Sequence, residues 1–147
     1  KILGYLSGLD KYRLEINLRS KENNYKGKIY SPRNYAKIMA SSKISFVTTG
    51  PADLVGTRYF EVMAGNRSLI ICNRMNKEVY SDILIDGFNC VMFDDEKGFL
   101  DLVHFYLNHE EERIKLVNNA YKHFLKVYTW ENSANNILNL IKSYLKK

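Results

Sequence analysis

Few residues in this sequence are of the kinds that cross-link small domains or build flexible linkers. Its 147 residues include two cysteines, two prolines and eight glycines. The cysteines, Cys72 and Cys90, lie apart in apolar stretches, and this spacing favours neither a disulfide framework nor a zinc site. We therefore expect two buried, reduced thiols in one ordinary globular domain without low-complexity segments.

Long apolar runs are also missing. None approaches the roughly 18 residues that a membrane-spanning helix needs, and we expect no signal peptide. Because the chain opens on Lys1 within an apparent strand, we expect it to be a fragment of a longer protein. These features predict a soluble domain from the reducing environment of the cytoplasm.

Aromatic and basic residues are plentiful by contrast. Seven Phe, 11 Tyr and one Trp can fill a sizeable core, so the fold needs neither disulfides nor a structural metal. Lys and Arg number 22 against 16 Asp and Glu, which gives a formal net charge of +6. Such a charge favours anionic partners, namely nucleotides, nucleic acid or an anionic membrane surface.

Short β-rich runs alternate with helical patterns, as is typical of a parallel sheet with helical crossovers. Strands are predicted at residues 1–6, 26–30, 43–48, 68–72 and 90–93. Helices are predicted at residues 9–21, 31–41, 57–64 and 77–83, and throughout the chain beyond Asp95. The pattern predicts an α/β fold: a single Rossmann-like three-layer domain with a parallel sheet and a helical C-terminal end.

Three apolar stripes at helical spacing mark the C-terminal region, which indicates helices with one face on the core. Their members are Phe99, Leu100, Val103, Tyr106 and Leu107, then Ile114, Val117, Tyr121, Phe124, Leu125 and Tyr128, and finally Ala134, Ile137, Leu138, Ile141, Tyr144 and Leu145. Trp130 is expected to anchor the last helix by packing. Lys142, Lys146 and Lys147 form a basic tail that is either solvated or in peripheral contact with a membrane.

The most informative segment is residues 48–71, TTGPADLVGTRYFEVMAGNRSLII, in which a buried strand runs through a Gly/Pro loop into a short helix. Open α/β sheets bind ligands beyond the carboxyl ends of their strands. The backbone N–H groups around Gly56, Thr57 and Arg58 suit a phosphate, and the Arg58 guanidinium suits a diphosphate. Glu61 lies one turn further along, where its carboxylate can bind vicinal sugar hydroxyls. The alternative is a loop that only turns the chain, with Glu61 as a cap or ion-pair partner.

The same segment resembles a motif of the GT-B glycosyltransferases: Asp53, seven residues (LVGTRYF), and then Glu61 opening the run EVMAGNRSLII. The motif belongs to their C-terminal, donor-binding half, especially in the group-1 branch that includes spore-maturation-protein-like transferases. There an acidic residue precedes, by seven residues, a Glu that opens E-A-x-A-x-G-x-P-hydrophobic, and Gly56 falls on the second glycine of the family's loop. This sequence departs from the pattern in having Asp53 for Glu, Asn66 for Gly and Ser68 for Pro.

Weaker likenesses follow in the same order along the chain. GYLSG at residues 4–8 resembles the strand and glycine turn that opens the family's domain. DGFN at residues 86–89 resembles its D-G-x-N turn, and YTWE at residues 128–131 resembles its closing segment with a tryptophan. Many relatives carry an Arg and a Lys just after the first strand, where this chain has Ser7 and Gly8. Lys11 or Arg13 are the alternative cations for the diphosphate.

The resemblance implies that residues 1–147 form the nucleotide-sugar-binding half of a GT-B enzyme whose N-terminal acceptor domain is absent. The reaction would transfer a hexose-type sugar from a nucleoside diphosphate donor, expected to be a UDP-sugar, without a metal or other cofactor. The donor and the missing domain would be the partners of this chain. Alone, the domain would bind donor but hardly turn it over.

The same resemblance gives roles to individual residues. Glu61 would bind the ribose hydroxyls, and Arg58 would stabilise the departing diphosphate together with helix amides. Asp53 and the loop from Gly50 to Gly56 would face the donor sugar and the diphosphate. Gly8 would lie in the glycine turn at the opening of the site.

Two other classes of function stay open on the residues. A non-catalytic α/β module could use a basic surface to bind nucleic acid or a protein partner. The sequence has no nucleic-acid motif and its basic residues are scattered, so we expect no nucleic-acid partner. An epimerase acting on a nucleotide sugar would share the GT-B shape and the same site. The three histidines, His104, His109 and His123, lack the spacing of metal ligands.

Overall fold

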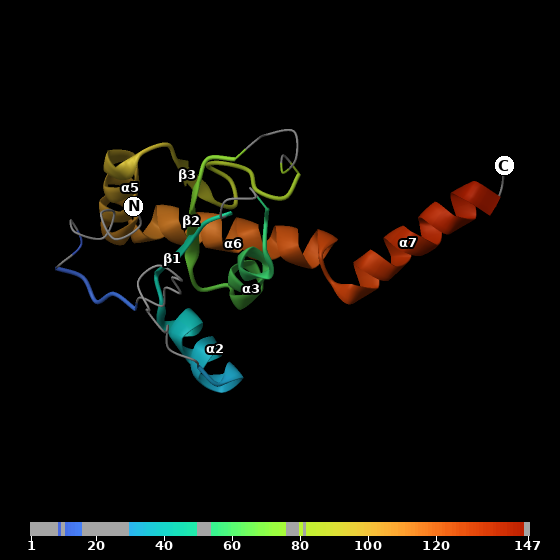
Figure 1. Ribbon diagram of the computed structural model, residues 1–147, viewed down its shortest axis with the longest axis horizontal. Helices are drawn as coiled ribbons and strands as arrows, with labels where there is room; N and C mark the ends of the chain where they lie inside the picture. The colour runs from blue at the N-terminus through green and yellow to red at the C-terminus, as the bar shows by residue number, and fades with distance from the viewer. Residues whose placement is uncertain are drawn as a thin grey trace, which may run out of the picture.

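The computed structural model describes residues 9, 11–15, 30–49, 54–75, 80 and 82–145 (Figure 1). Its helices and strands are α2 (Pro32–Ser41), β1 (Ile44–Val47), α3 (Thr57–Gly65), β2 (Leu69–Asn73), β3 (Val91–Phe93), α5 (Glu96–Asn108), α6 (Glu110–Val127) and α7 (Trp130–Leu145). They confirm the strands predicted at residues 43–48, 68–72 and 90–93, the helices predicted at 31–41 and 57–64, and the helical C-terminal end.

Predictions for the first 30 residues can be compared only in part. The strand predicted at residues 1–6, and all but Tyr30 of the one at 26–30, lie outside the described residues. The helix predicted at residues 9–21 is wrong at residues 11–15, which are not helical. Most of the helix predicted at 77–83 also lies outside the described part.

Parallel pairing organises the sheet. The order is β1-β2-β3, with Ile44 opposite Leu69 and Val47 opposite Cys72. A parallel pair needs a crossover connection, and α3 lies on the one between β1 and β2. All three strands therefore end at the same edge, here called the carboxyl edge, and begin at the opposite one, the amino edge.

Apolar side chains pack on both faces of the sheet. Successive residues of a strand point to opposite faces. In β2, Ile70 and Cys72 join residues of α3 in one cluster, whereas Leu69 and Ile71 join residues of α5 in another. α6 adds buried residues to both clusters. The domain is thus the expected Rossmann-like, three-layer α/β structure.

The buried face of α6 differs from the predicted one. The predicted stripe includes Ile114 and Leu125, but both are exposed. The buried residues of α6 are Arg113, Leu116, Val117 and Ala120. An arginine occupies a core-facing position because it has polar partners there, and a pattern based on apolar residues alone misses it.

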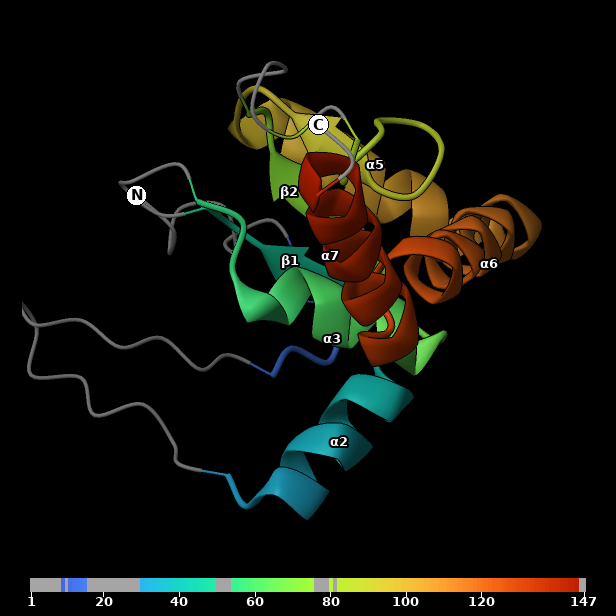
Figure 2. The same cartoon turned by 90° about the vertical axis from the view of Figure 1, so that its right-hand side faces the viewer.

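α7 projects from the body of the domain (Figures 1 and 2). None of its described residues is buried, and Trp130 is 90% exposed, so the predicted packing role of Trp130 is wrong. Polar contacts hold the start of the helix instead: Asn132 Nδ2 donates to the carbonyl oxygens of Leu125 and Lys126 at 2.8 and 2.9 Å. Among the described helices, none combines the length and apolar character that crossing a membrane requires.

Cys72 and Cys90 are both free and buried, which confirms the expectation of reduced thiols. The hydrogen-bonding contact with Cys72, together with burial, raises the pKa of the Cys90 thiol far above its usual range. Cys90 therefore stays protonated at neutral pH and behaves as a small apolar residue of the core.

The DGFN segment is a turn that leads into β3. Asn89 is fully buried; its Oδ1 accepts from the Ile85 N–H at 2.8 Å and its Nδ2 donates to the Ile83 carbonyl at 2.9 Å. Gly87 has φ +74°, a left-handed conformation that glycine adopts without strain. Asp86 Oδ1 then accepts from the Met92 N–H at 2.9 Å, which fixes the start of the strand.

We expect Asn89→Ala to destabilise the fold by about 2 kcal/mol, because it removes the two hydrogen bonds that this fully buried side chain makes to the backbone. Urea unfolding followed by circular dichroism measures this free energy. Asn118→Ala is the matched control, because Asn118 is exposed on α6 and its change should stay within about 0.5 kcal/mol. Equal stability of the two variants would contradict this role for the turn.

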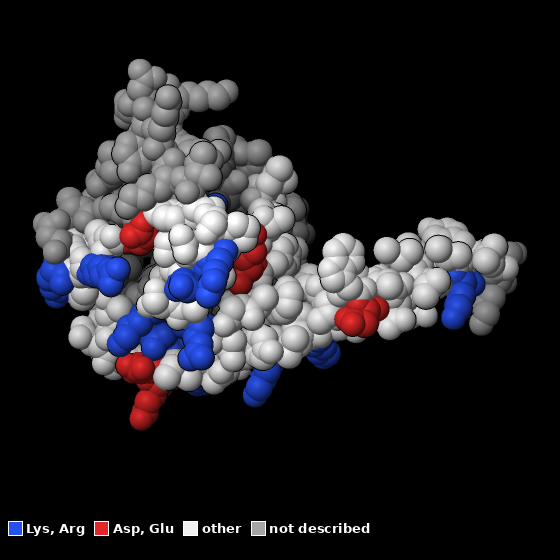
Figure 3. Space-filling view, turned by 90° about the horizontal axis from the view of Figure 1, so that it is seen from below, with Lys and Arg blue, Asp and Glu red and all other residues white. Residues whose placement is uncertain are grey.

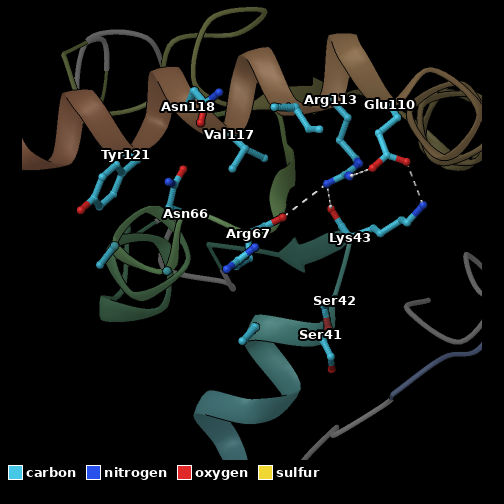
Figure 4. A pocket seen from close by; sticks show the side chains of 14 residues that line it. Ser41, Ser42, Lys43, Asn66, Arg67, Glu110, Arg113, Val117, Asn118 and Tyr121 are labelled. Carbon is cyan, nitrogen blue, oxygen red and sulfur yellow. Dashed lines mark hydrogen bonds and ion pairs between the residues drawn. The ribbon is translucent and has the colours of Figure 1, made fainter.

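A polar pocket of about 620 Å³ lies at the amino edge, between α2, α3 and α6 (Figure 4). Arg113, only 6% exposed, donates from Nη1 to the carbonyl oxygens of Lys43 and Arg67 at 3.4 and 3.3 Å. Its Nη2 lies 3.4 Å from Glu110 Oε1, and Lys43 Nζ lies 3.2 Å from Glu110 Oε2. Lys43, with Arg113, lowers the pKa of Glu110. Arg113 thus joins α6 to the residues just before β1 and β2.

Arg113→Met should lower the free energy of unfolding by about 2 to 3 kcal/mol, since it removes the donors from two backbone carbonyls and a partner from Glu110. Arg67→Met is the control: Arg67 is exposed, and its side chain has no partner among the described residues. Chemical denaturation of the two variants provides the comparison. An equally large loss of stability in Arg67→Met would show that the loss of a positive charge, and not of the Arg113 hydrogen bonds, destabilises the fold.

Candidate functional site

The start of α3 lies at the carboxyl edge of the sheet, where the loop after β1 ends. Gly56 is the N-cap residue, with φ −86° and ψ 172°, and no side chain in the described part of the chain caps the helix. Among the residues that the structure describes, no atom lies within 4 Å of the position that a Cβ on Gly56 would take. The first amides of α3, at Thr57 and Arg58, thus have no side-chain cap among the described residues, and the helix dipole at this end favours an anionic ligand.

α3 presents two different faces. Tyr59, Val62 and Met63 are buried against the sheet, and the Tyr59 hydroxyl donates to the Val47 carbonyl at 3.3 Å. Arg58 and Glu61 are exposed and lie three residues apart on the helix, which places them on one face. The apolar spacing of the helix therefore holds these two charged side chains away from the core.

Tyr35 of α2 meets this charged face. Its hydroxyl donates to Glu61 Oε2 at 2.8 Å. Burial raises the pKa of Tyr35 and the Glu61 carboxylate adds to that increase, while the Arg58 guanidinium acts in the opposite direction. The structure thus brings together Arg58 and Glu61 of α3 with Tyr35 of α2, for which the sequence pattern predicts no role in the site.

Side chains also join the ends of β1 and β2 at the carboxyl edge. The Thr49 N–H donates to Asn73 Oδ1 at 3.2 Å, and Asn73 Nδ2 donates to Thr49 Oγ1 at 3.2 Å. This reciprocal pair holds the beginning of the loop that leads to α3. Asn73 is not among the site residues predicted from the sequence. The signal that could have identified it is a polar residue directly after the apolar run LIIC.

Arg74, just after β2, bridges two further elements. Its Nε donates to Asp94 Oδ1 at 2.7 Å and its Nη1 to Asp86 Oδ2 at 3.2 Å. The hydrogen bond to Asp94 chiefly raises the pKa of Arg74, and Asp86 contributes. Arg74 is thus matched by two carboxylates, whereas Arg58 has no ion-pair partner within the described part of the chain.

The predicted site residues divide into two groups. Gly56, Thr57, Arg58 and Glu61 lie together at the start of α3. Gly8, Gly50 and Asp53 lie outside the described residues, and their roles stay predictions.

The segment that carries Lys11 and Arg13 packs toward α5. There the Tyr12 hydroxyl lies 2.8 Å from His104 Nδ1, and Lys11 Nζ lies 5.1 Å from the centroid of the Tyr12 ring. His109 and His123 each contact a backbone carbonyl. In the part of the chain that is described, no three His, Cys, Asp or Glu residues are grouped to hold a metal ion.

Basic side chains are grouped on one visible part of the surface (Figure 3). Figure 3 views the domain from the side on which α2 lies, and there Lys and Arg side chains gather on the body. α7, by contrast, carries only Glu131 and Lys142 within its described residues. Some basic residues that are scattered in the sequence therefore lie near one another on the face seen in Figure 3, together with some acidic ones, and such a cluster favours an anionic partner.

A comparison with known protein families matches this chain over residues 2–139 to the family described as glycosyl transferase-like. No curated protein matches it. The matched range includes all three strands of the described sheet, the start of α3 and the DGFN turn. Because the match extends over most of the 147 residues, this chain, with its Rossmann-like α/β domain, belongs to the glycosyl transferase-like family.

Proposed function

We propose that this domain binds a nucleoside-diphosphate sugar, with a UDP-sugar as the expected donor, at the carboxyl edge of its sheet. In this proposal it is the C-terminal half of a GT-B enzyme, and the acceptor and any general base come from a second domain. One observation carries the proposal: the uncapped N-terminus of α3 holds Arg58 and Glu61 one turn apart, in a chain of a glycosyl transferase-like family.

The diphosphate would lie against the first turn of α3. Amides that no side chain caps, the positive end of the helix dipole and the exposed Arg58 guanidinium all favour a group with two adjacent phosphates. The same groups would stabilise the charge that develops on the diphosphate as the sugar departs. Gly56 would let the phosphates approach the backbone, because it has no Cβ.

Glu61 would bind the ribose. It lies four residues beyond Thr57, which is about 6 Å along the helix axis, and a ribose is separated from its diphosphate by a similar step. An ionised carboxylate accepts hydrogen bonds from two vicinal hydroxyls. Asp53, Gly50 and Gly8 would complete the site on the side of the donor sugar and the diphosphate.

Calorimetric titration with UDP, GDP and ADP tests the proposal. We expect one diphosphate to bind selectively, and Glu61→Gln to weaken its binding at least ten-fold, because the neutral amide is a poorer acceptor for two hydroxyls. Glu111→Gln is the matched control, because Glu111 is exposed in the first turn of α6. This variant should bind the diphosphate with the affinity of the unchanged protein, within two-fold.

Two results would contradict the proposal. In the first, none of the three diphosphates binds, but the chain binds arbitrary DNA or RNA in a salt-sensitive way. That result would favour the non-catalytic α/β module that uses a basic surface. In the second, a diphosphate binds equally well to Glu61→Gln and to the unchanged chain.

A further inference from the structure

Arg58 and Glu61 could neutralise each other. Opposite charges three residues apart on a helix are neighbours that commonly form an ion pair. Among the described residues, however, neither side chain has an ion-pair partner. The contact that Glu61 does make is with Tyr35, whose neutral hydroxyl donates to Oε2 at 2.8 Å, and the Arg58 guanidinium interacts with the same phenol. A neutral donor thus stands where an ion pair is otherwise expected.

We infer that Tyr35 is a positioning residue of the nucleotide site: it holds the Glu61 carboxylate through Oε2 and leaves Oε1 for the ribose. This inference rests on the proposed function of Glu61. An exposed glutamate has three rotatable side-chain bonds, and ordering them on binding costs conformational entropy. With Oε2 already engaged, much of that ordering precedes the nucleotide. Because Glu61 is held by Tyr35 and not by Arg58, the Arg58 guanidinium remains available to the diphosphate.

The fold gives Tyr35 a firm base. Ser31 caps α2 and Pro32 opens it; Ser31 Oγ accepts from the Asn34 N–H at 3.3 Å, and the Tyr35 N–H donates to the Ser31 carbonyl at 2.9 Å. At the other end, the Ser68 hydroxyl, just before β2, donates chiefly to the carbonyl of Ser42, the C-cap residue of α2, at 2.5 Å, and lies 3.3 Å from the Met39 carbonyl oxygen. Tyr35 is therefore carried by a helix whose first turn is capped and whose last turn is joined to the sheet.

The phenol also remains a donor under ordinary conditions. Burial raises the pKa of Tyr35, and the adjacent Glu61 carboxylate raises it further. The Tyr35 hydroxyl therefore stays protonated at neutral pH. Its hydrogen bond to Glu61 contributes fully to stability below the ordinary tyrosine pKa, near 10, and this contribution is lost only as the pH rises above that value. An ionised Tyr35 would repel Glu61 instead of holding it.

A double-mutant cycle of Tyr35→Phe and Glu61→Gln tests the inference, with the diphosphate that binds the unchanged chain as the probe. Tyr35→Phe retains the ring and removes the hydroxyl, and we expect it to weaken binding by about three- to ten-fold. In the Glu61→Gln background the same change should alter affinity less than two-fold, because the carboxylate that Tyr35 positions is gone. The 2′,3′-dideoxy form of the same diphosphate should not respond to Tyr35→Phe.

Control measurements separate positioning from packing. Tyr144→Phe is the matched control, since Tyr144 is 70% exposed on α7, and its affinity should not change. Thermal unfolding checks that Tyr35→Phe remains folded. Repeating the titration at increasing pH should show that the advantage of tyrosine over phenylalanine is retained up to about pH 10, the ordinary pKa of tyrosine, and declines only above it.

The outcomes distinguish the two hypotheses. If Glu61→Gln weakens binding but Tyr35→Phe does not, the positioning role is overturned while the proposed function stands. A loss of equal size in both backgrounds, or an equal loss for the dideoxy probe, also overturns the positioning role and indicates packing of α2 on α3. If Glu61→Gln has no effect, or no diphosphate binds at all, the proposed function fails and the inference fails with it.

Discussion

The rest of the structure depends on the parallel pairing of β1 with β2. Parallel strands require a crossover, and the crossover helix α3 must start where β1 ends and return along the sheet before β2 begins. That requirement places the uncapped end of α3 at the carboxyl edge, with Tyr59, Val62 and Met63 against the sheet. The charged residues between these apolar positions are left facing outward and toward α2. The candidate site is thus a consequence of how the sheet is connected.

The two edges of the sheet differ in how their charges are used. At the amino edge, Lys43 and Arg113 are matched by Glu110, and Arg113 also serves the carbonyls that precede the strands. At the carboxyl edge, Arg74 is matched by two carboxylates, but Arg58 and Glu61 are not paired with each other. Charges that are matched internally stabilise the fold, whereas unmatched neighbours retain their attraction for a ligand. Arg67 at the amino edge is also unmatched among the described residues, so the proposed site rests on Arg58 and Glu61 lying together at the start of α3.

Much of this was accessible from the residue pattern because it depends on near neighbours. The start of α2 at Ser31 and Pro32 follows capping rules, and the left-handed Asn66, at φ 49°, occupies the position of the family's glycine. The spacing of Arg58 and Glu61 placed both on one face of a single helix. Burial of Arg113 and the exposure of α7 were missed. The hydropathy pattern does not show that backbone carbonyls are present to accept from a buried arginine. Nor does it show whether the core has a free surface on which the apolar face of α7 could pack.

The sequence by itself determined the alternation of strands and helices, the three-layer class and the local geometry of α3. Hydrogen bonds and side-chain periodicity within a few residues are enough to specify these features. Only the tertiary structure decided that Tyr35 reaches Glu61 across 26 positions of the chain, and that Thr49 and Asn73 join two strand ends. Such contacts depend on which helix faces pack together and in what register, and that is set by the sum of the core contacts, not by any short stretch of residues.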